Sequence, residues 1–295
     1  YRSGVIKKKH RVTAIGRCSR ARGHSISRLC GYFKISRSGY YKRNKQKVTQ
    51  SMERQMVIEM IVQARRLQPR IGGRKLYHIL GGQIHSLSPG LGRDKFFGLL
   101  RSAGLLVSRK RSYTRTTDSY HRFHRYGNLL KDLAVTSPNK VLVTDITYIR
   151  TRGGFSYLSL LTDYYSRKIV GWHLSGSLEI EGSICALQMA LSGCSDTQGL
   201  IHHSDRGIQY CSDPYTGLLR SRGVRISMTQ ENHCYENALA ERVNGILKDE
   251  YLLDATFRDH QHARRACAEA IRLYNTRRPH WALGLKTPEE VHRAA

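Results

Sequence analysis

An aspartate within an apolar stretch is the first sign of chemistry in this chain. Asp145 interrupts the run "VLVTDITYI" (141–149), where strand alternation places it on the same face as Val143 and Thr147. A charged side chain in a central strand costs free energy unless it is paired or bound to a metal ion. Carboxylates hold Mg²⁺ in proteins, and two such ions roughly 3.5–4 Å apart can bridge the nucleophile and the leaving group of a phosphoryl transfer. Asp145 is therefore a candidate metal ligand.

Two other aspartates follow strand-like stretches. Asp205 comes directly after "LIHHS" (200–204), and open α/β sheets place their ligands at this carboxyl end of a strand. Taken alone, Asp205 is equally consistent with a turn residue. Asp163 competes as an acid at a strand end, but its context "TDYYSRK" (162–168) fits a turn better than a metal ligand.

A helix over 236–252 would carry a further acid. On a period of about 3.6 residues its polar and apolar side chains separate, so one face can line a site while the other packs on a sheet. The polar face comprises Asn237, Glu241, Asn244 and Lys248, and the apolar face comprises Leu239, Val243 and Ile246. Glu236, at the helix start, suits the helix dipole without any further role. Lys248 either contacts a DNA phosphate or is a solvated residue that pairs with Glu241 or Asp249.

The elements that would position these residues alternate between strands and helices. We expect strands at 139–149, 155–166, 168–176, 199–205 and 224–229, and helices at 179–193, 212–223 and 236–252. Three strands followed by alternating helices and strands is the order of a ribonuclease-H-like α/β domain with a five-stranded mixed sheet. Residues 138–295 are therefore expected to form a catalytic core with a helical tail at its C-terminal end.

The excess of positive charge lies in the front half of the chain. Residues 1–140 contain 32 Lys and Arg against 5 Asp and Glu, whereas residues 141–295 contain 18 against 17. This balance predicts a polyanionic partner, and nucleic acid is the expected one. A membrane surface is the alternative, but nothing in the sequence resembles a basic amphipathic helix with a clean apolar face.

The basic half divides into three regions. We expect residues 1–24 to be an extended basic arm because they lack a clear period, residues 25–106 to be helical, and residues 107–137 to be a basic linker. The helical region has a short helix at 26–33, a second one capped by Ser36, a longer helix from Met52 to Leu67, and a pair at 70–80 and 93–105 with Gly104 as a cap.

This helical pattern is compatible with a helix-turn-helix, although two packed helices would produce the same pattern. The basic residues expected to contact DNA are Arg28, Lys34, Arg37, Lys42 and Arg43 in the helical region, with Arg109, Lys110 and Arg111 in the linker.

The cysteines, the lack of targeting signals and the first residue indicate in which kind of environment the protein works and whether the sequence is a fragment. Seven cysteines without a Cys-x-x-Cys pair argue against a disulfide framework and against a structural zinc site. The sequence shows no signal peptide and no apolar run long enough to cross a membrane, which predicts a soluble intracellular protein. It starts with Tyr1 rather than methionine, so it is either a fragment or the downstream part of a longer translation product.

Several stretches of the sequence point together to one family. They are "VTDITYI" (143–149), "LLTDYYSRKIVGW" (160–172), "HHSDRGIQY" (202–210), "YENALAERVNGILKDEY" (235–251) and the tail "YNTRRPHWALGLKTPEEV" (274–291), with "RSGYY" (37–41) and "RIGGRKL" (70–76) upstream. With these motifs the chain resembles the OrfB-type transposases of bacterial insertion sequences, which have a retroviral-integrase-like core. The likeness covers nearly the whole chain.

The resemblance implies a DDE-type polynucleotidyl transferase whose acidic triad falls on Asp145, Asp205 and Glu241, with 35 residues between the last two. It implies two Mg²⁺ ions, replaceable by Mn²⁺, held by these acids. The implied function is a DNA transposase that binds the terminal repeats of its element, cleaves DNA and transfers strands to target DNA. The implied setting is a homo-oligomer on double-stranded DNA, associated with the nucleoid in the bacterial cytoplasm, with an upstream helix-turn-helix protein as partner or fusion.

The sequence departs from its relatives in three respects, and two alternatives stay open. The paired His/Cys zinc module of retroviral integrases is absent, and Glu236 stands where many relatives have aspartate. Such relatives often work as a fusion to an upstream helix-turn-helix protein, and the start at Tyr1 is consistent with an upstream part that this sequence does not include. A catalytically idle DNA-binding repressor derived from a transposase is one alternative, and a ribonuclease-H-like nuclease without strand transfer is the other. The intact triad weighs against the first, and the basic front half with the "YNTRRPH" tail weighs against the second.

Overall fold

The computed structural model describes residues 8–108, 124, 126–230 and 237–294, and the chain divides into two compact units. One unit comprises residues 1–64 and 76–106, and the other comprises residues 65–75 and 107–295. Four residues discussed above, Arg109, Lys110, Arg111 and Glu236, lie outside the described residues, as does half of the expected linker. Among the described helices, none combines the length and the apolar character needed to cross a membrane.

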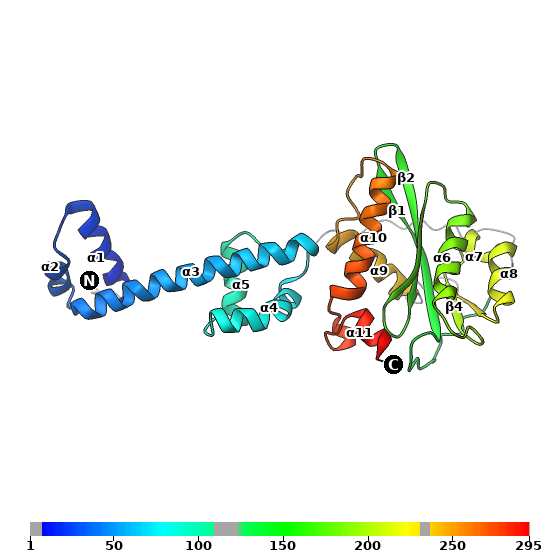
Figure 1. The fold of residues 1–295 in the computed structure, drawn as a ribbon, viewed down its shortest axis with the longest axis horizontal. Coiled ribbons are helices and arrows are strands. Elements are labelled where there is room, and N and C mark those ends of the chain that lie inside the picture. Colours follow the sequence, from blue (N-terminus) through cyan, green and yellow to red (C-terminus); the bar gives the residue numbers. More distant parts are fainter. Residues whose placement is uncertain (1–7, 109–123, 125, 231–236, 295) are drawn as a thin grey trace. The chain divides into compact units, whose positions relative to one another are not determined.

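The first unit is helical. It contains α1 (Lys8–Arg22), α2 (Ile26–Tyr32), α5 (Arg93–Ser102) and most of α3 (Arg37–Leu67) and α4 (Gly73–Leu87) (Figure 1). The expectation of an extended arm is therefore wrong for residues 8–22. Val12 and Ile15 are buried against Cys30 and Tyr40, and this packing stabilises α1 although two apolar residues among many basic ones give no clear period.

The third helix is longer than the sequence indicated. α3 is a continuous helix of 31 residues that starts at Arg37, whereas the long helix was expected to start at Met52. The predicted cap is confirmed, because the Oγ atom of Ser36 accepts a hydrogen bond from the backbone N–H of Gly39 at 3.1 Å. The expected pair of helices is present as α4 and α5, and Gly104 follows α5 with φ of 68°, a left-handed value that glycine adopts without steric cost.

The second unit is built on one five-stranded mixed sheet. Its strands are β1 (Val141–Thr151), β2 (Gly154–Asp163), β3 (Ile169–Ser175), β4 (Ile201–Ser204) and β5 (Arg225–Met228), in the order β3-β2-β1-β4-β5. The pairs β1–β2 and β2–β3 are antiparallel, and the pairs β1–β4 and β4–β5 are parallel. This topology confirms the predicted ribonuclease-H-like α/β fold, with β1 at the centre of the sheet.

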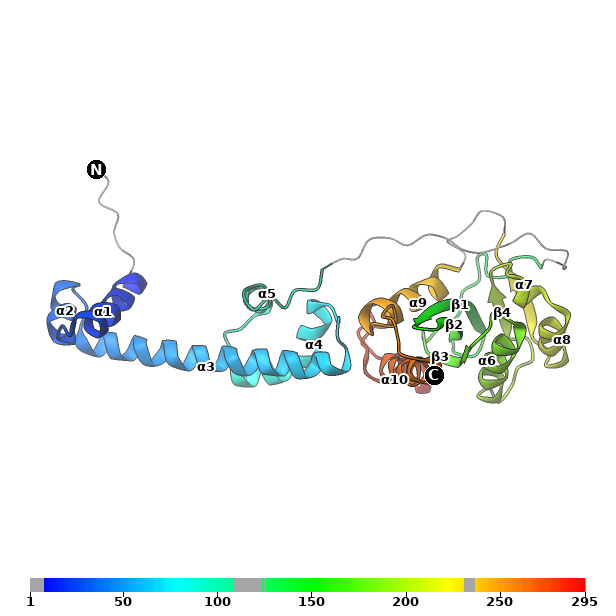
Figure 2. The same cartoon turned by 90° about the horizontal axis from the view of Figure 1, so that it is seen from above.

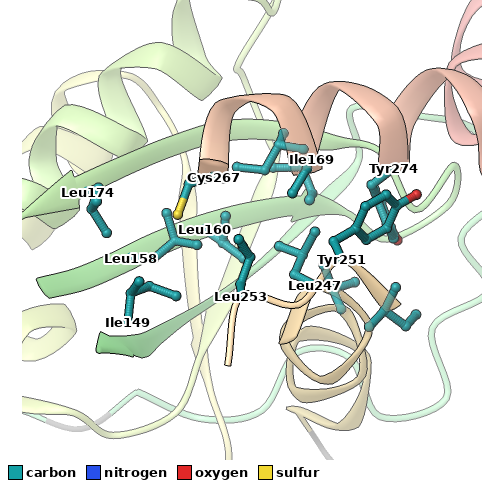
Figure 3. Close-up of a cluster of buried hydrophobic side chains, with 14 of the residues drawn as sticks. Ile149, Leu158, Leu160, Ile169, Leu174, Leu247, Tyr251, Leu253, Cys267 and Tyr274 are labelled. Carbon is teal, nitrogen blue, oxygen red and sulfur yellow. The ribbon is translucent and has the colours of Figure 1, made fainter. Parts of the chain in front are cut away.

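Helices cover both faces of this sheet (Figure 1, Figure 2). One face packs on α9 (Ala238–Glu250) and α10 (His260–Arg277), and Figure 3 shows that core, in which Leu158 and Leu160 of β2 are buried. The other face packs on α6 (Ile180–Ser192), α7 (Ile208–Cys211) and α8 (Asp213–Ser221), where the neighbouring Leu161 is buried. Alternate side chains of one strand therefore supply two separate cores, as the two-residue strand period requires. The chain ends with α11 (Pro288–Arg293).

The tail motif of residues 274–280 fastens α10 to the rest of this unit. The Oδ1 atom of Asn275 accepts a hydrogen bond from the backbone N–H of Ile169, and its Nδ2 atom donates to the Ile169 carbonyl, both at 2.9 Å. Arg278 is 2% exposed and donates from Nε and Nη2 to the two carboxylate oxygens of Glu250 at 2.8 and 2.7 Å. The tail therefore completes the fold around the last turn of α9.

Asp163 is the last residue of β2, and its side chain stabilises the turn that follows, in agreement with the turn context of the sequence. Its side chain is fully buried and accepts hydrogen bonds from the backbone N–H groups of Asn139 and Ser166 and from the Ser166 hydroxyl, each at 2.7 Å. The two bonds from Ser166 stabilise the connection between β2 and β3, and the bond from Asn139 joins the segment before β1 to the end of β2, so both carboxylate oxygens are used.

Close packing of β3 on α6 explains the glycine in the motif "KIVGW". A methyl group added at Gly171 would lie 2.8 Å from the Cβ atom of Ala190 and would also meet the Ala186 carbonyl. We expect Gly171→Ala to lower the free energy of unfolding by about 2–3 kcal/mol, because the backbone of α6 would have to move. Urea unfolding of the full chain measures the change.

Gly217→Ala is the matched control for this substitution. Gly217 lies within α8, is exposed, and a Cβ atom there would meet nothing within 4 Å. Alanine should stabilise the helix at this position by about 0.5–1 kcal/mol. Equal effects of the two substitutions would contradict close packing at Gly171.

Candidate active site

Asp145 lies in the middle of the central strand, on the face that α9 covers. Its neighbour Val143 is buried together with Ala240 of α9. The Oδ2 atom of Asp145 accepts a hydrogen bond from the Asn244 side-chain amide at 2.7 Å, and its Oδ1 atom accepts one from the backbone N–H of Ile146 at 2.9 Å. The carboxylate is therefore held in place by one strand and one helix.

The parallel pairing of β1 and β4 brings Asp205 toward Asp145. Val143 pairs with His203 in this ladder, and the two aspartates each follow two residues later in their chains. The Oδ1 atom of Asp205 accepts a hydrogen bond from the backbone N–H of Gly207 at 3.0 Å, which fixes the turn after β4. The neighbouring strands β1 and β4 thus place two carboxylates close together, at the point where β4 ends.

Glu241 approaches the same region from the first turn of α9, where its side chain is exposed. The electrostatic effect of Glu241 on the pKa of Asp145 shows that the two side chains are close to one another. The pKa of Asp145 is raised to about 7, chiefly by burial and then by the negative charge of Asp205; the hydrogen bonds from Asn244 and Ile146 oppose the rise, and Glu241 makes a smaller contribution in the raising direction. The structure therefore brings together the three acids that the sequence singled out.

The three acids are not close enough together to form a complete metal-binding site by themselves. Within the described part of the chain, no group of three or more His, Cys, Asp or Glu side chains has the spacing of a complete metal site. Asp145 nevertheless interacts electrostatically with both Asp205 and Glu241, so the three acids share one negatively charged region. Hard oxygen donors of this kind suit Mg²⁺ and Mn²⁺ rather than softer metals.

The polar face predicted for α9 meets Asp145. Asn237 precedes the helix and donates from Nδ2 to the Thr144 carbonyl at 3.1 Å, and Asn244 contacts Asp145 as described. The Oδ1 atoms of both asparagines are buried, and neither has a hydrogen-bond partner among the residues that the structure describes. Lys248 is partly buried: burial lowers its pKa, and the charge of Asp145 acts in the raising direction. Lys248 therefore lies within electrostatic reach of Asp145.

Two residues near the acids were missed by the sequence analysis. The Thr144 hydroxyl donates to the Leu160 carbonyl at 2.9 Å, and it also lies 3.3 Å from the Tyr210 hydroxyl. Burial, followed by the charges of Asp145, Tyr215 and Asp205, raises the pKa of Tyr210 well above its ordinary value, so this hydroxyl stays protonated. The position of Tyr210 five residues after Asp205 in "HHSDRGIQY" was the available signal.

The paired histidines of this motif are packing residues. His202 is buried with its Nε2 atom 2.9 Å from the Tyr215 hydroxyl, and burial together with His203 lowers its pKa to about 3. His203 is buried with its Nδ1 atom 2.8 Å from the Ser227 hydroxyl. Neither is a candidate ligand of a metal held by the three acids.

The C-terminal end of α9 is anchored by a buried ionic cluster that the sequence did not reveal. Besides the two hydrogen bonds from Arg278, Glu250 has the Lys75 ammonium 3.5 Å away, and its backbone carbonyl accepts from the Arg70 N–H at 3.1 Å. Burial would raise the pKa of Glu250, but Arg278 and Lys75 hold it below its ordinary value. Burial and Arg278 lower the pKa of Lys75 to about 8. The helix that carries Glu241 is thus fixed at both ends.

The described residues expected to contact DNA in the helical region lie in the first unit. They are Arg28 on α2, Lys34 in the following loop, and Arg37, Lys42 and Arg43 at the start of α3. All are exposed except Arg43, which is half-buried. They belong to a different unit from the acids, so their assignment as DNA contacts stays a prediction.

Comparison with known proteins identifies the family. Two family matches, both described as "Integrase core domain", cover residues 135–234 and 222–288. The chain is 34% identical over 277 residues to the "Insertion element IS600 uncharacterized 31 kDa protein" of Shigella sonnei, covering 90% of this chain and 100% of that protein. It is 31% identical over 273 residues to "Transposase InsF for insertion sequence IS3A" of Escherichia coli (strain K12), covering 90% and 93%.

A solved structure is also similar. The catalytic core domain of HTLV-2 integrase in complex with magnesium is 21% identical, with a TM-score of 0.42, over 53% of this chain and 97% of that chain. The resemblance drawn from the sequence motifs is confirmed by the family matches and by the two relatives, which extend over nine tenths of the chain, and the two alternative functions are not favoured. The chain belongs to the family of insertion-sequence DNA transposases, DDE-type polynucleotidyl transferases that carry an integrase core domain.

Proposed function

We propose that Asp145, Asp205 and Glu241 are the catalytic acids of this transposase, and that they hold two divalent metal ions, Mg²⁺ or Mn²⁺. The observation that carries the proposal is the raised pKa of Asp145, to which burial, Asp205 and Glu241 all contribute. A buried carboxylate next to two further acids is an unfavourable arrangement unless a cation balances the charge. Each ion would be held by only one or two of these carboxylates, with DNA oxygens as further ligands.

The reaction would be cleavage of a phosphodiester bond at the ends of the element, followed by transfer of the new 3′-hydroxyl to target DNA. Metal ions bound between these acids would activate the attacking oxygen and stabilise the leaving oxygen. The acids themselves would not bond covalently to DNA, because in this type of phosphoryl transfer the protein supplies positioning and charge.

The other side chains at the site would position the reacting groups. Asn244 holds one oxygen of Asp145 through its amide, and Asn237 ties the start of α9 to β1 at Thr144. We assign Lys248 to a DNA phosphate beside the metal ions, where an ammonium group acts as a point charge. Asn237 and Asn244 would also offer their buried Oδ1 atoms, which have no partner among the described residues, as hydrogen-bond acceptors.

The basic front half of the chain would bind the terminal repeats and target DNA as double strands, with Arg28, Lys34, Arg37, Lys42 and Arg43 among its contacts and Arg109, Lys110 and Arg111 following in the linker. The active form on DNA would be a homo-oligomer, because two element ends have to be joined in one event. An upstream helix-turn-helix protein, separate or fused, would complete the assembly.

Removal of a single acid should abolish chemistry and spare DNA binding. We expect Asp145→Asn, Asp205→Asn and Glu241→Gln each to reduce cleavage of end-repeat DNA by roughly 100-fold or more, since each removes a metal ligand. Glu181→Gln, which changes an exposed acid at the start of α6, is the matched control and should leave cleavage unchanged. Cleavage and strand transfer are measured on labelled oligonucleotides, and binding by fluorescence anisotropy.

The same assay separates the proposed function from its alternatives. Cleavage with strand transfer supports a transposase, and cleavage without any strand transfer under all metal conditions would indicate a nuclease. Full activity of any one of the three acid variants would remove that residue from the site.

The charge on Asp145 should be visible in the stability of the metal-free protein. The folded-state pKa of about 7 lies above the ordinary value of 3.8, so the bound proton stabilises the fold at low pH, and this contribution is lost as the pH rises through 7. Relative to Asp145→Asn, the wild-type protein should lose on the order of 1–3 kcal/mol between pH 5 and pH 8. Urea unfolding in EDTA measures the difference.

Addition of Mg²⁺ provides the control within this experiment. It should restore stability to the wild-type protein at pH 8 and have little effect on Asp145→Asn. If both proteins showed the same dependence on pH and on Mg²⁺, Asp145 would not be an unneutralised carboxylate at a metal site.

Lys248→Ala tests the proposed phosphate contact. Loss of the ammonium should weaken binding of end-repeat DNA and slow strand transfer by roughly tenfold, with folding stability nearly unchanged. Lys286→Ala, which removes an exposed lysine of the same unit, is the control and should change neither activity. Identical behaviour of the two variants would leave Lys248 a surface residue without a role on DNA.

A further inference from the structure

The middle of α3 exposes a row of apolar side chains that the helical unit does not cover. Tyr41, Val48, Met52 and Met56 are 49%, 53%, 63% and 50% exposed. Figure 1 and Figure 2 show α1 and α2 beside one end of α3 and α4 and α5 beside the other. The buried residues of α3 agree with this view, because they are Tyr40 near its start and Val57 and Ile61 in its second half.

These side chains lie on one narrow face of the helix. Positions 41, 45, 48, 52, 56 and 59 are spaced by three or four residues, and at about 3.6 residues per turn they fall within a strip roughly 80° wide. The strip, here called the α3 stripe, consists of Tyr41, Lys45, Val48, Met52, Met56 and Glu59, all of them exposed. Its spacing repeats after 11 residues, a period close to that of a straight helix, so a partner helix can follow it with little supercoiling.

We propose that the α3 stripe is a dimerisation surface, and that its partner is the α3 stripe of a second copy of this chain in antiparallel orientation. With the two Met52 side chains at the two-fold axis, Val48 of each copy lies opposite Met56 of the other. The same register places Lys45 opposite Glu59, twice in the dimer. Apolar contacts at the centre and opposite charges at both ends make the stripe complementary to itself, as an isologous interface requires.

The charge distribution along α3 selects the antiparallel orientation. Residues 37–47 contain five basic residues and no acid, whereas residues 57–67 contain two arginines and one glutamate. A parallel pair in register would place Lys45 against Lys45, Glu59 against Glu59, and the two most basic segments side by side. The antiparallel pair separates the basic segments and replaces each like-charged contact by an opposite-charged one.

The pairing is independent of the acidic site and of the chemistry proposed for it. It assigns the protein–protein contact to a specific helix of the first unit and predicts association of the full chain in the absence of DNA. DNA is a poorer occupant of this face, because the centre of the stripe offers methionine and valine side chains rather than donors for phosphate.

Site-specific photocrosslinking tests the orientation. The full chain carries p-benzoylphenylalanine in place of Tyr41, an exchange of one aromatic side chain for another, and ¹⁴N- and ¹⁵N-labelled copies are mixed before irradiation without DNA. The antiparallel pair places position 41 opposite Gln63 of the second copy, so crosslinks should join it to the tryptic peptide of residues 55–65. Crosslinks to residues 38–54 of the second copy, or no crosslink between copies, would overturn the proposal.

Charge reversal tests the contact between Lys45 and Glu59, with crosslinking from position 41 as the readout. Lys45→Glu and Glu59→Lys should each lower the yield roughly tenfold, because each creates two like-charged contacts in the dimer, and the double variant should restore it. Arg54→Glu makes the same charge reversal on the opposite side of α3 and should leave the yield unchanged. Circular dichroism confirms that each variant folds. Single variants with full yield, or a double variant no better than the singles, would refute this register.

Discussion

The charge of Asp145, buried in the central strand, is the constraint around which the second unit is built. An ionised carboxylate in that position destabilises the metal-free fold, and the raised pKa of Asp145 is the consequence. Two hydrogen bonds, from Asn244 and from the backbone of Ile146, offset part of the cost. The remaining stability has to come from elsewhere, and the sheet supplies it by burying apolar side chains on both of its faces.

The helix α9 connects Asp145 to the rest of the unit, because it is held at both of its ends. Its start is tied to β1 through Asn237, and its end is held through Glu250 by the buried Arg278. Breaking a buried ion pair of this kind typically costs about 3–5 kcal/mol because one charge is left uncompensated. Glu241 is itself exposed, so its position depends on the helix rather than on packing of its own side chain. Residues far from the acids, in the tail and in the segment that contains Lys75, thereby fix where Glu241 lies.

Local patterns in the sequence were sufficient to predict the sheet and to mark Asp145 as unusual, whereas the grouping of Asp145 with Asp205 and Glu241 came from the family resemblance. Alternation and β-branched residues marked the strands, and an aspartate within "VLVTDITYI" stood out because charge is rare in a central strand. Periodicity separated the two faces of α9. The helical conformation of residues 8–22 was missed because Val12 and Ile15 gain their partners only in the folded chain, through contacts with Cys30 and Tyr40.

Long-range polar pairs could not be predicted for a related reason. Arg278 stands in the basic stretch "NTRRPH" and has every local sign of an exposed residue, yet its partner Glu250 lies 28 residues earlier in the chain. The same holds for Tyr210, whose hydroxyl meets Thr144 across 66 residues. Burial of a polar side chain is decided by whether a partner is present in three dimensions, and a single sequence does not contain that information.

The placement of Lys248 follows from the same electrostatic balance. In the metal-free protein Asp145 acts as a counter-charge to Lys248, because its charge opposes the lowering of the Lys248 pKa that burial causes. Under the proposed function, cations held by the acids would take over the neutralisation of Asp145, and the ammonium would lose this partner. A partly buried ammonium without a counter-charge is unfavourable, so a DNA phosphate would become its best available partner. Metal binding and DNA binding would then favour one another. The metal ions would neutralise Asp145, and the DNA phosphate would neutralise Lys248, so neither charge would be left without a partner.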